Sequence, residues 1–242
     1  MEIGLADGVL VGVAFIAAFG AATLGSSGGL LLAVMATVLP APLAVPAHAA
    51  VEGFRNGIGW SRLGKAFSPQ IAIAIGVGSF VGIGLAASFA PVVPAHVQAI
   101  LLGAFLFWAC WWPVQDPGKR FPFRLPLIGG ISGACSVFLG ETGPLVRPFI
   151  ADEPVDPALV PGSAIAASAV QHGLKVVAFV LIGIDYLSLL PVLAAMIAAT
   201  LAGVLLADRL RLRVPVGIAS LLIRLAVSAL AIRLVAHAAG WI

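Results

Sequence analysis

The amino-acid sequence predicts an all-α polytopic membrane protein made of two inverted repeats, with about eight transmembrane helices or more. Three observations lead to this prediction. Of the 242 residues, 61% are hydrophobic and only 10% are charged, whereas soluble domains carry about a quarter charged residues. Residues 8–51 and 66–115 contain no Asp, Glu, Lys or Arg. A similar order of apolar segments also occurs twice along the chain, and each uncharged run has room for a span of about 20 residues.

The first repeat is expected to cover residues 1–114. It begins with two apolar segments separated by the glycine-rich break LGSSGGLLL at 24–32, and a predicted proline-bearing loop, LPAPLAVP at 39–46, follows. Gly and Pro are the strongest signals that regular structure is interrupted. The predicted apolar segments are 5–24, 28–39, 46–66, 70–90 and 95–113.

The second repeat is expected over residues 126–242, after a polar and basic linker at 115–125. Its break is LGETGPLVR at 139–147, and its proline-bearing stretch is DEPVDPALVP at 152–161. The order of long and short segments matches that of the first half, which indicates an internal duplication. The predicted apolar segments are 126–139, 143–151, 160–182, 186–207 and 214–236.

Basic residues in the loops predict opposite orientations for the two halves. Arg55, Arg62 and Lys65 precede the fourth segment, whereas the following loop at 91–96 has neither Lys nor Arg. In the second half the order is reversed, because the loop at 183–186 lacks basic residues and the stretch 208–213 holds three arginines. Basic loops face the cytoplasm, so corresponding loops lie on opposite sides, as in many secondary transporters. The linker is then cytoplasmic, and both termini lie on the non-cytoplasmic side of the cell (inner) membrane.

Each repeat is predicted to open with a glycine-broken helix pair, either re-entrant or discontinuous. The segments at 28–39 and 143–151 are only about 13–18 Å long as helices, too short to cross the hydrocarbon layer. Irregular backbone at membrane depth persists only where it is buried in protein or lines a wet cavity. We therefore expect GSSGG and GETGP to face each other near the middle of the membrane.

The two breaks are the first candidate substrate site. A helix that starts after a glycine break offers free N–H groups and the positive end of its dipole, both of which attract anions. The alternative is that the glycines only allow helices to pack closely. The candidate substrate-binding residues here are Gly25, Ser26, Ser27, Gly28, Gly29, Gly140, Thr142, Gly143 and Arg147.

A polar stripe follows each break and adds further candidates. His48, Glu52, Arg55 and Asn56 share one helix face in the first repeat, and Ser168, Gln171, His172 and Lys175 share one in the second. Charges are costly in lipid, so both faces should point inward or toward a cavity. The candidates for substrate binding are Asn56, Gln171, His172 and Lys175. Lys175 could instead extend toward the membrane surface, and Arg55 could be a topology anchor.

Glu141 is the main candidate for proton coupling, together with His172. A carboxylate in a low dielectric must pair with a cation, be hydrated or take up a proton. Arg147 could be the partner of Glu141 or a contact for the anion. The alternative to proton coupling is that Glu141 and Arg147 form a purely structural ion pair. The role of Arg224, midway along the last helix, is left open.

The chain resembles the sulfite exporter TauE/SafE family of four-plus-four membrane permeases. The resemblance covers nearly the whole chain and rests on GAATLGSSGGLLLAVM (20–35), AAVEGFRNGIGW (49–60) and GISGACSVFLGETGPLVRPFI (130–150). It implies secondary export of a small sulfur-containing or organic anion such as sulfite, sulfoacetate or a related sulfonate. The chain differs from the family at both breaks. Ser26 and Ser27 stand where glycines are usual in the first repeat, and Glu141 interrupts the usual run of glycines in the second. These differences concern the substrate more than the fold.

The expected function is therefore secondary transport by alternating access and not an enzyme activity. Two alternatives are a membrane-embedded lipid-pyrophosphate phosphatase and a thiol electron carrier that uses Cys110 and Cys135. No cofactor and no metal are expected, and no loop of the form GxxxxGK followed by Ser or Thr is present for ATP. The net charge of +3 lies mostly in short loops, which argues against nucleic-acid binding. The expected partners are a small anion, the lipid bilayer and protons as the coupling ion, and a homodimer is left open.

Overall fold

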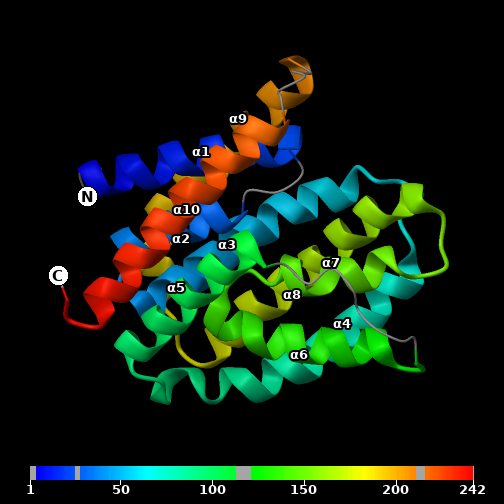
Figure 1. Cartoon of the computed structure of the whole chain (residues 1–242), viewed down its shortest axis with the longest axis horizontal. Helices are drawn as coiled ribbons and strands as arrows, with labels where there is room; N and C mark the ends of the chain where they lie inside the picture. Colours follow the sequence, from blue (N-terminus) through cyan, green and yellow to red (C-terminus); the bar gives the residue numbers. More distant parts are fainter. Residues whose placement is uncertain (1–3, 25–27, 113–120, 211–215, 242) are drawn as a thin grey trace.

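The computed structural model describes residues 4–24, 28–112, 121–210 and 216–241. Within these ranges the chain forms ten α-helices, two short 3₁₀ helices and no strand, which confirms the all-α prediction (Figure 1). Gly25, Ser26 and Ser27 and most of the predicted linker lie outside the described residues. The helices are α1 Leu5–Leu24, α2 Gly28–Val38, α3 Ala41–Ser61, α4 Pro69–Ala87, α5 Ala95–Trp111, α6 Arg124–Leu139, α7 Gly143–Ala151, α8 Val160–Leu181, α9 Tyr186–Leu210 and α10 Val216–Ala238, with η1 Ala90–Val92 and η2 Pro157–Leu159.

The chain is a multi-pass membrane protein. Five described segments are long and apolar enough to cross a bilayer, and three further apolar helices are shorter. The five segments are Leu5–Thr23, Pro69–Val92, Pro157–Leu181, Tyr186–Leu210 and Gly217–Ala238. Helix α3 has 21 residues, which is enough to span about 30 Å, but it carries the polar stripe of the first half.

The helix ends on either side of the two glycine breaks lie where the sequence predicts them. Helix α1 ends at Leu24 and α2 begins at Gly28, and α6 ends at Leu139 before α7 begins at Gly143. Gly140 ends α6 with φ +70°, a left-handed conformation that glycine adopts without a steric cost. Helices α2 and α7 have 11 and 9 residues, so they are about 16 Å and 13 Å long.

The prediction that residues 39–46 form a loop is wrong. Helix α3 begins at Ala41, with Pro42 in its first turn and Pro46 inside it. A proline in the first turn removes an N–H that has no partner within the helix, so it is compatible with a helix start. The same helix ends at Ser61, five residues before the predicted end at 66.

Four helix pairs make up most of the packing. Helix α4 lies along α6, α1 along α9, α3 along α8, and α5 along α10. In the α4–α6 pair the backbones touch, because Gly78 and Gly82 face the carbonyl groups of Pro126 and Gly130. The Ser79 hydroxyl also donates to the Gly129 carbonyl at 3.1 Å. Small residues allow such close approach between helices in a membrane.

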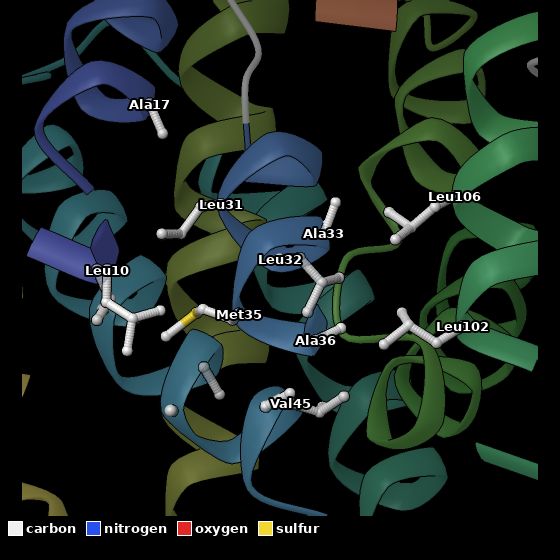
Figure 2. Close-up of a cluster of buried hydrophobic side chains, with 14 of the residues drawn as sticks. Leu10, Ala17, Leu31, Leu32, Ala33, Met35, Ala36, Val45, Leu102 and Leu106 are labelled. Atoms are coloured by element: carbon white, nitrogen blue, oxygen red, sulfur yellow. The ribbon is translucent and has the colours of Figure 1, made fainter. Parts of the chain in front are cut away.

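The two short helices both pack apolar side chains into the interior of the protein. Leu31, Leu32 and Met35 of α2 pack among side chains of α1, α3 and α5, including Leu10 and Leu102 (Figure 2). Val146 and Ile150 of α7 belong to a second cluster with residues of α4 and α8. Helix α2 is thus largely enclosed by protein, whereas α7 is packed on one face and has Arg147 and Ala151 exposed.

Candidate functional site

The polar stripes of α3 and α8 meet in the interior. His48 and His172 lie edge to face with ring centroids 5.6 Å apart, and both are 3% exposed or less. Glu52 and Lys175 are each 1% exposed. The close approach depends on Gly53, because a Cβ there would lie 3.4 Å from the His172 Cβ. Four ionisable side chains are thus buried between two helices.

Glu52 is paired with Arg55 one turn further along α3. The Arg55 Nε donates to both carboxylate oxygens of Glu52 at 3.0 Å, and its Nη2 donates to Oε2. The Asn56 side-chain amide donates to the Glu52 carbonyl at 2.9 Å. A buried carboxylate needs a cationic partner such as Arg55, because its loss of hydration would otherwise cost several kcal/mol. Arg55 therefore holds a buried ion pair and is more than a topology anchor.

Glu141 brings the two glycine breaks together. Its Oε1 accepts a hydrogen bond from the Gly143 N–H at 2.8 Å. Its Oε2 lies over Gly28, where an added Cβ would be 2.8 Å from that oxygen and 3.5 Å from Oε2 of Glu52. The Gly28 carbonyl lies 3.2 Å from Nε2 of His48. A residue of the second break therefore contacts the first, and glycine at position 28 leaves the necessary space.

Lys175 connects α8 to the end of α6. Its Nζ donates to the carbonyl oxygen of Gly140, the residue that caps α6. A cation at a helix C-terminus satisfies a free carbonyl and interacts favourably with the helix dipole. The charges of Glu141 and Glu52 also act on Lys175. Lys175 is buried inside the protein, so it does not extend toward the membrane surface.

Glu52, Glu141 and His172 could together approach a metal ion. Each offers one ligand atom, and these atoms lie within 4.8 Å of one another. However, the two carboxylates already have two cations close by, Arg55 and Lys175. A divalent ion would have to compete with both cations. The local charges therefore favour a self-neutralised ionic network over a resident metal.

A cavity of about 930 Å³ opens beside this network. The charged residues of its wall are Arg55, Arg147, Arg224 and Glu141, so the wall is net positive among the described residues. Gly28, Gly29 and Gly143, in the first turns of α2 and α7, also line the cavity. Fixed positive charge in a partly enclosed space attracts anions.

The predicted substrate residues fall into separate groups. Gly28, Gly29, Asn56, Gly143 and Arg147 line the cavity together with Glu141. The buried Thr142 and the capping residue Gly140 are in the α6–α7 break, while His172 and Lys175 belong to the ionic network behind the wall.

Gln171 lies elsewhere. Its amide donates to the hydroxyls of Ser79 at 2.9 Å and Ser132 at 2.8 Å, and so it links α8 to α4 and α6. Its role in the described structure is to join three helices.

Sequence reasoning gave no role in the site to three residues that belong to it. His48 and Glu52 appeared only as members of a stripe, although their spacing of four residues already placed them on one face. Arg224 is a charge in the middle of a spanning helix, which is itself a signal of function. Cys110 lines the cavity and Cys135 lies on α6, and both thiols are free.

Comparison of the chain with protein-family models, with curated proteins and with solved structures finds no match. The site thus consists of a positively lined cavity, two glycine breaks in contact and a buried ionic network.

Proposed function

We propose that the chain is a secondary transporter, and an exporter, of a small sulfur-containing or organic anion, working by alternating access. One observation carries the proposal: three arginines, Arg55, Arg147 and Arg224, line one cavity at the point where the two glycine breaks meet. Charges at membrane depth are expensive and usually mark a transport path. Sites between the repeats at the membrane midplane, bounded by broken helices, are typical of secondary transporters.

The pairing of helices supports the proposed inverted repeat. If α1 to α5 correspond to α6 to α10, a two-fold axis exchanges the α1–α9 pair with the α4–α6 pair, and both pairs are present. The same axis matches α3 with α8 and α5 with α10, and these counterparts also pack on each other. The polar residues of the two halves also have the same spacing. Glu52 and Arg55 follow His48 by four and seven positions, and His172 and Lys175 follow Ser168 by the same numbers. Both comparisons favour duplication of a five-helix unit.

We also propose a relationship to the TauE/SafE family and its class of anions, which includes sulfite, sulfoacetate and related sulfonates, because the sequence around the two glycine breaks resembles that family. The opposite distribution of basic loops in the two halves supports termini on the non-cytoplasmic side of the cell membrane.

Protons are the proposed coupling ion, and Glu141 is the group that exchanges them with the cavity. Its carboxylate lines the cavity on one side and has an oxygen within 4.8 Å of a carboxylate oxygen of Glu52 and of a ring nitrogen of His172 on the other. A proton on Glu141 would remove one negative charge beside the bound anion, which favours the anion. Binding of proton and substrate would then be linked.

Replacing the cavity arginines is expected to weaken anion binding while the protein stays folded. Arg147→Gln and Arg224→Gln each remove a charge-assisted hydrogen bond, which contributes about 1.5–3 kcal/mol, so the Kd for sulfite or a short sulfonate should rise about 10- to 100-fold. Arg233→Gln on the exposed face of α10 is the matched control. Titration of the purified proteins, followed by the shift in unfolding temperature, measures the effect. An unchanged Kd in the Arg147→Gln/Arg224→Gln double variant would reject the proposed anion site.

A further inference from the structure

The cavity is much larger than a bare inorganic anion requires. Liquid water takes up roughly 30 Å³ per molecule, so 930 Å³ corresponds to about 30 waters. Pockets of roughly 300–1,000 Å³ usually enclose drug-sized organic ligands. An oxyanion of a few heavy atoms beside the arginines would leave most of the space without ligand contacts.

Most of the remaining wall is apolar. Helix α10 contributes Ile223 and Val227 on either side of Arg224, so charge and apolar surface alternate along one helix. Leu106 of α5 lies close to the first turn of α2, where an added Cβ on Gly29 would be 3.8 Å from the Leu106 Cδ2. The apolar surface therefore begins next to the helix start that is proposed to bind the anion. The apolar wall, a name used for the apolar part of this lining, includes Phe105, Leu106, Ala109, Pro144, Ile223 and Val227.

We propose that the substrate is an amphipathic organic anion, with a compact oxyanion head held by the arginines and a hydrocarbon tail of several carbons against the apolar wall. This inference rests on the proposed function and narrows its substrate class. Tail contacts add hydrophobic binding energy that sulfite cannot supply, because apolar surface leaves water when the tail enters the cavity. A sulfonate head suits the arginines, since it stays negatively charged over the whole physiological pH range and offers three oxygens that accept hydrogen bonds.

A homologous series of alkanesulfonates tests this proposal. Each methylene that is fully buried should tighten binding about fourfold, so hexanesulfonate is expected to bind at least tenfold more tightly than methanesulfonate. Kd values are measured by competition against one labelled sulfonate, with the purified full chain in detergent below the micelle-forming range of the ligands. Hexanol, which has the tail without the charge, controls for partition into the detergent and should not compete.

Filling the cavity provides a second, independent test. Ala109 lines the cavity on α5, so Ala109→Leu should weaken hexanesulfonate at least tenfold and leave methanesulfonate within twofold. Ala104→Leu on the exposed face of the same helix is the matched control and should change neither Kd.

The outcomes separate the two levels of the proposal. Equal Kd values for methanesulfonate and hexanesulfonate, or hexanol competing as well as hexanesulfonate, would overturn the amphipathic substrate and leave an anion site intact. The ratio of the two Kd values could also be the same in Ala109→Leu as in the unaltered chain. That result would place the tail outside the cavity and would also overturn the amphipathic substrate. No binding of sulfite or of any sulfonate would reject the transport proposal itself.

Discussion

Replacing Gly82 by alanine is expected to lower the free energy of unfolding by about 3 kcal/mol or more. An added Cβ would overlap the Gly130 carbonyl and lie 2.8 Å from its carbon and 3.0 Å from the Ala134 nitrogen. These atoms belong to the backbone of α6 and cannot rotate away, so the two helices would have to separate. Overpacking against movable side chains costs about 1–3 kcal/mol, and a rigid backbone puts this site at or above the upper end of that range.

The same helix provides the control. Gly84 is two residues further along α4, and an added Cβ there has no atom within 4 Å. Gly84→Ala should leave stability unchanged or raise it by up to about 1 kcal/mol, because alanine favours the helix over glycine. Denaturant titration of both variants in the same detergent measures the difference. Equal stabilities for the two variants would contradict the close backbone contact between α4 and α6.

Glu52→Gln is expected to have a comparable effect through the ionic network. The change leaves Arg55 and Lys175 without the Glu52 carboxylate, and breaking a buried ion pair usually costs about 3–5 kcal/mol. The Arg55 side chain remains 21% exposed, so water offsets part of the loss and we expect about 3 kcal/mol. The free energy of unfolding in detergent again provides the measurement.

Two further variants separate pairing from burial. Glu52→Gln/Arg55→Gln removes both charges and should recover part of the lost stability. Asp208→Asn breaks the exposed pair between Arg62 and Asp208, whose side chains are 45% and 56% exposed, and should cost less than about 1 kcal/mol. If Glu52→Gln were no more costly than Asp208→Asn, the ionic network would not be a buried one.

Helix boundaries marked by glycine were predictable from local chemistry. The segments expected at 28–39 and 143–151 correspond to α2 Gly28–Val38 and α7 Gly143–Ala151, because each starts after a glycine-rich break in an apolar run. The proline signal was ambiguous, since Pro42 lies in the first turn of α3 and Pro46 inside it. A proline that begins a helix and a proline in a loop look alike in sequence until the hydrogen-bonding position is known.

Side-chain partners between distant helices could not be predicted in the same way. The spacing of Glu52 and Arg55 places both on one helix face, and the structure pairs them. In contrast, Gln171 binds Ser79 and Ser132, which are 92 and 39 residues away in sequence. Nothing local distinguishes a glutamine that joins helices from one that contacts a substrate, because the same amide serves both roles. The contact between Glu141 and Gly28 depends likewise on how the two breaks pack.

Exchange of a labelled sulfonate across a membrane tests the central claim most directly. The purified chain is reconstituted into liposomes loaded with unlabelled hexanesulfonate, and the uptake of external labelled hexanesulfonate is followed without ATP. We expect rapid uptake by exchange, at least tenfold slower in Arg224→Gln, and unchanged in Arg233→Gln. The same exchange is measured with sulfite. If neither labelled hexanesulfonate nor labelled sulfite enters vesicles that hold folded protein, the claim that the chain transports anions is contradicted.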